Sequence, residues 1–460
     1  MVRVPFLLCC KQEERSDLYR ETEWRESMKQ HPFTADIAVI GGGAAGLMAA
    51  LHAACGGAES VLILERHSRV GKKLLATGNG RCNLTNLRAE PAFYHGKNPE
   101  FCRPALGEFS PEWTTAFFDG IGVFCKEEEA GKIYPYSDQA ASVLDCLRAA
   151  ATESGRVRER CGFEVKSLRA EGGGFRISGE EGEVTARRVI LCTGGKAAPN
   201  LCSDGSGYRL LEALGHRTTP LFPALVQIRT DNRVTRALKG IKFNGTAVLL
   251  VDGRAVQREA GEILFAEYGL SGPPIFSLSR RAAEYGETGR VENVPVQRAE
   301  ISLNLFPNYA PERLEALLLA RQKRHPEIPL DQFFTGMVQK RIGQELLKTL
   351  GFSPLTRPSS ALSREEIKGL AHGLSDWRFE VRGGHSFQNA QVTAGGIRTD
   401  EAEPETMASK IVRGLYLCGE ILDVDGDCGG FNLQWAWSSG ALAGRSAARS
   451  LKHDWAERRE

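Results

Sequence analysis

The feature that most constrains this chain is a glycine-rich turn near its start, Gly41-x-Gly43-x-x-Gly46. A short apolar run, residues 36–40, precedes the turn, and a stretch rich in alanine and leucine, residues 44–54, follows it. A second apolar run, residues 61–64, comes next. Short apolar strands on either side of a helix are typical of a parallel βαβ unit. The sequence therefore predicts strand, turn, helix and strand, and with them an α/β fold.

Each glycine of this turn has a physical task in a dinucleotide site. Gly41 permits the tight turn, Gly43 lets a pyrophosphate approach the backbone, and Gly46 allows the helix to pack closely on the strand. Glu65 ends the second predicted strand, where a carboxylate binds ribose hydroxyls and repels a 2′-phosphate. The pattern predicts FAD or NAD in this site rather than NADP.

The charge balance and the cysteines argue against several classes of protein. The formal net charge is only +2, from 59 Lys and Arg against 57 Asp and Glu, so no strong field attracts nucleic acid or an anionic membrane. The twelve cysteines form no C-x-x-C pair and no zinc-spaced cluster with histidine. We expect a cytoplasmic protein with reduced thiols, no metal, no membrane or nucleic-acid partner, and a small-molecule substrate.

The pattern of elements predicts two domains. Residues 34–204 and 386–455 form the dinucleotide-binding domain, and residues 205–385 form an insert that is mainly β over 205–306 and mainly helical over 307–385. Residues 1–33 are expected to be a charged, disordered extension, and either Met1 or Met28 is the true start. No second G-x-G-x-x-G occurs in residues 205–395, which argues against a dedicated nicotinamide domain.

Two further apolar runs end in residues that should lie at the same edge of the sheet as the glycine turn. Thr193, Gly194 and Gly195 end one run, and Gly419 and Glu420 end the other. The carboxyl ends of parallel strands meet at one edge, which is where ligands of such sheets bind. Several glycines that permit close approach suit a ligand longer than a mononucleotide, so the sequence favours FAD.

An acidic, glycine-rich segment then precedes an apolar helix that is expected to begin at Leu433. A helix N-terminus stabilises the negative charge that a reduced flavin carries. The alternative is a glycine and asparagine turn that only caps an ordinary helix. Trp435 and Trp437 are expected in the core. We predict Glu420 and Asp423 beside the pyrophosphate or ribityl chain, Gly430 as a point of backbone access, and Asn432 with the N–H groups of Leu433 and Gln434 at the flavin ring.

Five longer motifs carry a resemblance to a known family. They are "GKKLLATGNGRCNLTN" (71–86), "GKIYPYSDQA" (131–140), "GLSGPPIF" (269–276), "QVTAGGI" (391–397) and the segment that runs from residue 409 into the last helix. In this order they resemble the BaiN-like or aminoacetone-oxidase-like family of FAD-dependent oxidoreductases. The resemblance implies a Rossmann-like FAD-binding domain of the two-dinucleotide-binding-fold type, interrupted by a β-barrel-like and helical insert, with FAD held non-covalently.

The resemblance also implies which residues contact FAD. Lys72 and Lys73 either neutralise the pyrophosphate or form a solvated pair. The implied contacts are Ala45, Glu65, Arg66, the loop that contains Lys72, Lys73, Gly78, Asn79, Arg81, Cys82 and Asn83, then Val165, Asp423, Asn432 and Leu433.

These features predict an FAD-dependent oxidoreductase that exchanges hydride between NAD(P)H, a transient co-substrate, and an organic substrate. Family members suggest an ene-reductase of steroid or bile-acid-like enones. Two alternatives stay open: an oxidase of a small amine or amino ketone that uses oxygen, and a non-catalytic FAD-bound or RNA-associated flavoprotein. The substrate, the hydride donor and the oligomeric state do not follow from the sequence.

The catalytic acid or base does not follow from the sequence either, and the candidates are weak. Tyr134 and Tyr136 could donate a proton to the substrate, or could belong to a proline turn in which Ser137 caps the next helix. Cys82 lies in the loop expected near the flavin, and the alternative is a small buried thiol.

Overall fold

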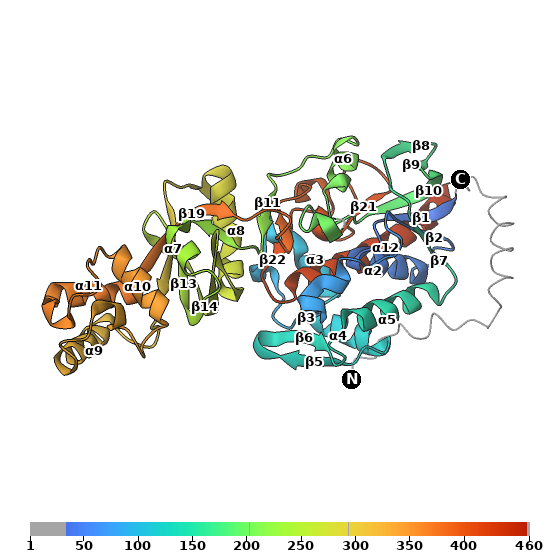
Figure 1. Cartoon of the computed structure of the whole chain (residues 1–460). Helices are drawn as coiled ribbons and strands as arrows, with labels where there is room; N and C mark the ends of the chain where they lie inside the picture. The colour runs from blue at the N-terminus through green and yellow to red at the C-terminus, as the bar shows by residue number, and fades with distance from the viewer. Residues whose placement is uncertain (1–33, 202, 293, 458–460) are drawn as a thin grey trace. The chain divides into compact units, whose positions relative to one another are not determined.

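The computed structural model describes residues 34–201, 203–292 and 294–457. The chain divides into two compact units, Met1–Leu221 with Val392–Glu460, and Phe222–Gln391 (Figure 1). The second unit therefore starts later than the predicted residue 205. The cause is helix α6 (Ser206–Glu212), whose Tyr208 and Leu211 are buried in the core of the first unit. The predicted extension, residues 1–33, and the choice of start codon lie outside the described residues.

Seven strands of the first unit form one sheet, in the order β7-β2-β1-β10-β9-β8 with β21 beside β10. Strands β7, β2, β1, β10 and β21 run parallel, so their carboxyl ends lie at one edge. The predicted βαβ unit is confirmed. Strand β9 pairs with β10, and β8 pairs with β9, in antiparallel fashion. The strands are β1 (Ala35–Ile40), β2 (Val61–Glu65), β7 (Val157–Cys161), β8 (Ser167–Glu171), β9 (Gly174–Gly179), β10 (Gly182–Leu191) and β21 (Leu415–Leu417).

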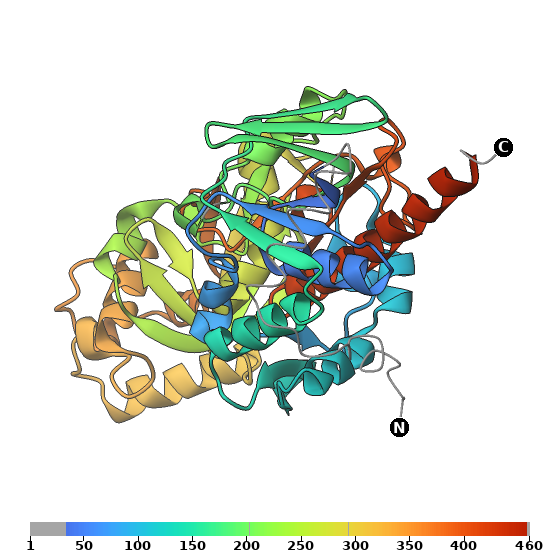
Figure 2. The ribbon, with the colours of Figure 1, turned by 90° about the vertical axis from the view of Figure 1, so that its right-hand side faces the viewer.

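Two helices cross closely beside this sheet, α2 (Ala44–Cys55) and α12 (Phe431–Glu457), as Figures 1 and 2 show. A Cβ on Gly440 would lie 2.5 Å from the backbone oxygen of Ala45, and one on Gly444 would lie 2.1 Å from that of Ala49. Only glycine fits at these two positions, and the crossing fixes the start of α12 relative to the glycine turn.

Helix α12 begins at Phe431, two residues earlier than predicted. The N–H of Gln434 already donates to the carbonyl of Gly430 at 3.0 Å, so it belongs to the helix and is not available to a ligand. Trp435 and Trp437 are buried, as predicted.

The rest of the first unit consists of shorter elements. Ser137 does not cap the next helix as considered above, because the N-cap of α5 is Gln139. The elements are α3 (Arg103–Glu108), α4 (Pro111–Gly120), α5 (Ala140–Thr152), a sheet of β3 (Thr85–Asn86), β6 (Lys132–Pro135) and β5 (Cys125–Glu128), and the pair β4 (Tyr94–His95) with β22 (Asp425–Gly426).

The second unit is a closed barrel with helices, which confirms the β-barrel-like insert. One hairpin of the barrel turns at Asp252 and Gly253, whose φ values of 47° and 79° suit a type I′ turn. The strands, in barrel order, are β12 (Ile228–Thr230), β15 (Gly269–Ser271), β14 (Arg254–Ala266), β13 (Lys242–Val251), β18 (Ala299–Asn304) and β19 (Trp377–Gly384). The helices are α7 (Asn232–Ala237), α8 (Pro273–Thr288), α9 (Pro311–Arg324), α10 (Lys340–Thr349) and α11 (Arg364–Ser375).

The predicted division of the insert into a β part and a helical part is too simple. Strand β19 lies in the segment expected to be helical, where Trp377, Phe379 and Val381 alternate with more exposed residues. Helix α8 lies in the segment expected to be β, with Ile275 and Leu278 buried at helical spacing. Within the described part of the chain, no helix is both long and apolar enough to cross a membrane.

Candidate functional site

The glycine turn lies at the carboxyl edge of the sheet, between β1 and α2. Gly41 has a φ of 104°, and a Cβ there would lie 2.7 Å from the backbone oxygen of Cys192. A Cβ on Gly46 would lie 1.9 Å from the oxygen of Gly41. Beside Gly43, in contrast, no described atom comes within 4 Å of the position of a Cβ. The first and third glycines thus serve the fold, whereas Gly43 borders open space at the start of α2, where unpaired N–H groups attract an anion.

Glu65 ties this turn to the end of β2. Its Oε2 accepts the N–H of Gly42 at 2.9 Å, and its Oε1 accepts the N–H of His67 at 2.9 Å. The neighbouring Arg66 pairs with Asp204 at 2.8 Å. The carboxylate predicted to bind ribose hydroxyls therefore lies directly beside the glycine turn and is held by two backbone donors.

The strand ends after β10 and β21 meet around Glu420. One carboxylate oxygen of Glu420 accepts Lys73 Nζ at 2.9 Å, and the other accepts the N–H of Thr393 at 2.9 Å. A Cβ on Gly195 would lie 2.4 Å from Thr393 Oγ1 and 2.7 Å from Glu420 Oε1. Lys73 is therefore an ion-paired residue of this edge rather than half of a solvated pair. Sequence reasoning missed Thr393, because no spacing rule marks it.

Ala45, in the first turn of α2, is buried at this edge, and a Cβ on Gly419, which has a φ of 75°, would lie 3.0 Å from Ala45 Cβ. The N–H of Gly419 donates to Ser439 at 2.9 Å, and its carbonyl accepts Trp435 Nε1 at 3.1 Å. These bonds fasten the end of β21 to helix α12.

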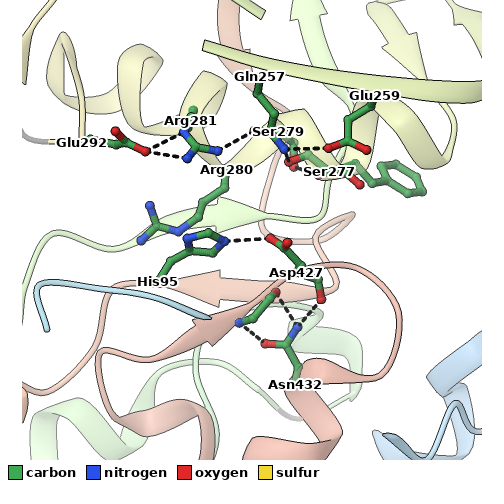
Figure 3. A network of polar contacts seen from close by, with 12 residues as sticks. His95, Gln257, Glu259, Ser277, Ser279, Arg280, Arg281, Glu292, Asp427 and Asn432 are labelled. Atoms are coloured by element: carbon green, nitrogen blue, oxygen red, sulfur yellow. Dashed lines mark hydrogen bonds and ion pairs between the residues drawn. The ribbon is translucent and has the colours of Figure 1, made fainter. Parts of the chain in front are cut away.

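The Asn432 side chain holds the loop before α12 (Figure 3). Its Oδ1 accepts the N–H of Gly426 at 2.8 Å, and its Nδ2 donates to the carbonyls of Gly426 and Asp427 at 2.8 and 3.3 Å. The amide group is thus engaged within the protein. A flavin contact from Asn432 or Leu433 stays a prediction for their backbone N–H groups, which lie in the first turn of the helix and lack intrahelical acceptors.

The loop that contains Lys72 and Lys73 continues into a segment with left-handed backbone at Gly78, Asn79 and Cys82. This segment ends at Asn83, against which Gly430 packs: a Cβ on Gly430 would lie 2.9 Å from Asn83 Oδ1. That oxygen is buried and has no hydrogen-bond partner among the described residues. The oxygen is therefore an acceptor without a donor, and it lies in the loop where the sequence predicts contacts with the flavin.

Arg81 is engaged within the protein. It bonds to Glu128 and to Asp138, with Nε at 2.9 Å from Asp138 Oδ1, and its guanidinium lies 4.1 Å from the centre of the Tyr134 ring. The bond to Glu128, followed by that to Asp138, raises the pKa of Arg81. Arg81 therefore stabilises its own loop in this structure.

The three weak catalytic candidates differ in their surroundings. Burial raises the pKa of the Cys82 thiol to about 12, so the thiolate is not populated near neutral pH. Tyr134 lies against Arg81, and burial raises its pKa. Tyr136 is 67% exposed. Cys82 therefore has the environment of a small buried thiol, and a role for either tyrosine stays a prediction.

The structure adds a pair of side chains that sequence reasoning missed. His95 Nε2 lies 2.7 Å from Asp427 Oδ1, although the two residues are 332 positions apart in the chain (Figure 3). Only the pairing of β4 with β22 brings them together, so no local motif could have marked them.

Unpartnered buried hydroxyls lie near the same strand ends. Among the described residues, Thr193 Oγ1, Ser203 Oγ and the Tyr208 hydroxyl have no hydrogen-bond partner. Burial, and next the nearby carboxylates of Glu420 and Asp423, raise the pKa of Tyr208. A buried polar group without a partner costs about 1–3 kcal/mol, so these atoms suit a polar ligand. Together with the open space at Gly43 and the oxygen of Asn83, they fit FAD.

Two other features of the described residues do not add to this site. A groove of about 1390 Å³ lies beside β8, β9 and α6 and includes Val165 but not the glycine turn. No group of three or more His, Cys, Asp or Glu side chains in the described chain could hold a metal ion.

The chain is similar to several known proteins along most of its length. The HI0933-like protein Rossmann domain matches residues 35–446. The 3-dehydro-bile acid delta(4,6)-reductase of Clostridium scindens is 38% identical over 413 residues, which cover 90% of this chain and 98% of the relative. The ribosomal RNA dihydrouridine synthase of Escherichia coli is 32% identical over 408 residues, which cover 88% of this chain and 96% of the relative. The open conformation of a flavocytochrome c3 fumarate reductase is similar with a TM-score of 0.44 and 17% identity, covering 95% of this chain and 82% of that one.

Proposed function

Because the chain belongs to the HI0933-like family of Rossmann-type FAD-dependent oxidoreductases, we propose that it reduces carbon–carbon double bonds conjugated to a carbonyl group, with hydride from NADH or NADPH. The observation that carries this proposal is the 38% identity to a 3-dehydro-bile acid delta(4,6)-reductase along nearly the whole of both chains. A bond at the 4 position of a 3-oxo steroid nucleus is conjugated to the carbonyl. We therefore favour a steroid or bile-acid-like enone as the substrate.

The relative named as a ribosomal RNA dihydrouridine synthase supports reduction of the same class of bond. Dihydrouridine differs from uridine by the loss of one ring double bond that is conjugated to a carbonyl, so a dihydrouridine synthase acts on the same arrangement of atoms. The two relatives differ in the size of the substrate and share the chemistry of the bond. This shared chemistry supports the proposal at the level of the reaction, whichever molecule carries the bond.

A uridine in ribosomal RNA is the second candidate substrate, because the Escherichia coli relative is 32% identical over almost its full length. The net charge of +2 gives little electrostatic attraction for RNA, which depends on neutralising phosphates. The higher identity to the bile-acid reductase and this low charge favour the small molecule.

The residues of the first unit would divide the binding of FAD among them. The glycine turn with the start of α2 would hold the pyrophosphate, Glu65 the ribose, and Asn83 with the first N–H groups of α12 the flavin ring. When bound, FAD supplies hydride transfer. The chain's contribution is to fix these donors and acceptors before the ligand arrives, through bonds such as those of Glu65 to Gly42 and His67.

Anaerobic reduction tests the proposal. The purified protein is titrated with NADH and then NADPH while the flavin absorbance is followed, and the reduced protein is then mixed with a 3-oxo-4,6-diene bile acid or with a ribosomal RNA transcript. We expect one nucleotide to bleach the flavin and the bile acid to restore its colour. Recovery with the RNA alone would favour the second candidate, and a flavin that neither nucleotide reduces would contradict the proposed hydride donor.

A further inference from the structure

The segment that carries His95 is fastened residue by residue to the segment that leads into α12. The carbonyl of Phe93 accepts the N–H of Asp427 at 3.0 Å, and the Phe93 ring stacks on that of Phe431 with 5.0 Å between centroids. The Tyr94 hydroxyl donates to the carbonyl of Phe431 at 2.9 Å. These contacts give the His95 ring a fixed place beside the loop that precedes α12.

Asp427 is fixed in the same way from the other side. The Asn432 amide holds both the N–H and the carbonyl of Gly426 and also the carbonyl of Asp427 (Figure 3). The pair of His95 and Asp427 is therefore fixed to the same stretch of backbone as Gly429 and Gly430, which are two and three residues beyond Asp427. Such double support is what a site needs in order to hold a catalytic group in one geometry.

The pair of His95 and Asp427 is more exposed to solvent than the other aspartates that precede α12. The side chains of His95 and Asp427 are 21% and 36% exposed, whereas Asp423 and Asp425 are 3% and 1% exposed. Asp423 and Asp425 are thus enclosed in the protein. The pair is therefore more open to solvent than these two carboxylates.

The bond to Asp427 also defines the chemistry of the two ring nitrogens. Because Nε2 lies 2.7 Å from a carboxylate oxygen, it carries a hydrogen in the neutral ring as well as in the protonated one. The second nitrogen, Nδ1, has no hydrogen-bond partner among the described residues, so it is the nitrogen that is left to bond to a substrate. A carboxylate behind a histidine stabilises the imidazolium and orients the ring.

We propose that His95, held by Asp427, is the proton donor in the reduction of the conjugated double bond, an assignment that rests on the proposed function. As hydride from the NAD(P)H-reduced flavin adds to the carbon β to the carbonyl, the π electrons move to form an enolate. The α carbon of the enolate takes the proton from Nδ1 of the imidazolium, and the new C–H bond completes the saturated ketone. The neutral ring regains a proton from water. Asp427 is the positioning residue.

The experiment compares His95→Gln with the wild-type holoenzyme after photoreduction, which removes the need for a nucleotide. On mixing with a 3-oxo-4,6-diene bile acid, we expect the limiting rate of flavin reoxidation to fall about 100-fold, since a general acid contributes roughly 10²–10⁴-fold. The enone concentration at half-saturation should change less than about threefold, and the solvent deuterium isotope effect should rise, because protonation becomes rate-limiting. His372→Gln, at a residue whose side chain is 70% exposed on α11, is the matched control.

A second readout does not depend on turnover. In ¹⁵N-histidine NMR spectra of the holoenzyme, the signal that His95→Gln removes should show hydrogen on Nε2, and Asp427→Asn should weaken that preference. A reduced wild-type enzyme that no enone reoxidises would overturn the proposed function and this assignment with it. Wild-type behaviour of His95→Gln, a loss explained by weaker enone binding, or hydrogen on Nδ1 in the neutral ring would overturn the assignment alone.

Discussion

At the scale of single residues, Glu65 combines hydrogen bonds seen in the structure with a predicted contact to the cofactor. It accepts the N–H groups of Gly42 and His67, and it is the predicted partner of the ribose. Because hydrogen bonds to a charged group contribute about 1.5–3 kcal/mol, we expect Glu65→Ala to raise the Kd for FAD about 10- to 100-fold. Fluorescence titration of the protein stripped of flavin measures the Kd. The control is Glu59→Ala, because Glu59 is exposed and precedes β2, the strand that Glu65 ends. Equal affinity in both variants would contradict the placement of the site.

His52 on α2 makes stability depend on pH. It is 6% exposed among Phe109, Trp113 and Phe117, and burial, followed by the charge of Arg445, lowers its pKa from 6.5 to about 3. Between these two pKa values, His52 is therefore protonated in the unfolded chain and neutral in the folded protein. The stability that the neutral, buried His52 contributes is lost as the pH falls from about 6.5 towards 3.

We expect the free energy of unfolding attributable to His52 to be about 2 kcal/mol smaller at pH 5 than at pH 7. The measurement is urea unfolding of the wild type and of His52→Gln at both pH values. The difference between the two pH values should shrink by this amount in His52→Gln and stay unchanged in His372→Gln. A His52→Gln protein with the same pH dependence as the wild type would show that His52 is protonated in the folded state.

At the scale of elements, the crossing of α2 and α12 places the start of α12 relative to the glycine turn. A Cβ on Gly444 would lie 2.1 Å from the oxygen of Ala49, which the backbone of α2 cannot avoid without moving. We expect Gly444→Ala to lower the free energy of unfolding by about 1–3 kcal/mol and to weaken FAD retention. The control is Gly369→Ala in the middle of α11, where no described atom lies within 4 Å of the new Cβ.

The two substitutions should act in opposite directions in urea unfolding. Alanine at residue 369 is expected to stabilise by about 0.5–1 kcal/mol, because it has the higher helix propensity and meets no obstacle. A stabilising effect at both positions would mean that α12 can move away from α2 without cost.

Some elements of the fold could be predicted from the sequence and others could not. The turn of Gly41, Gly43 and Gly46 lies between two apolar runs, and such short-range patterns identify their elements directly. Strand β7, with the sequence VRERC, has apolar residues only at its ends, so its place in the sheet depends on pairing with β2. The position of α8 within the barrel unit likewise depends on contacts distant in sequence.

The residues of the candidate site also divide into those that short-range patterns could identify and those that they could not. The position of Glu65 beside the glycine turn could be predicted from spacing alone, because it ends a strand at a fixed distance from the glycines. The task of the Asn432 amide and the pairing of His95 with Asp427 could not, since each depends on a loop closing or on two strands meeting.

At the scale of the whole molecule, each unit has a hydrophobic core of its own. One core draws its buried residues from residues 35–211 and 397–451, and the other from residues 228–381. All six barrel strands lie in the second unit, residues 222–391, and a closed barrel leaves no open sheet edge. A continuous segment with its own core is expected to fold alone.

We therefore expect residues 222–391, produced as a separate protein, to unfold cooperatively and to bind no flavin. The near-ultraviolet circular dichroism should show ordered aromatic side chains, because Phe265, Trp377 and Phe379 pack against one another within this unit. The matched substitution is Phe265→Ala, which should lower the free energy of unfolding of the segment by about 3–5 kcal/mol, as for other buried aromatic residues. Flavin binding by this segment would contradict the assignment of FAD to the first unit. A segment without cooperative unfolding would show that the barrel needs the rest of the chain in order to fold.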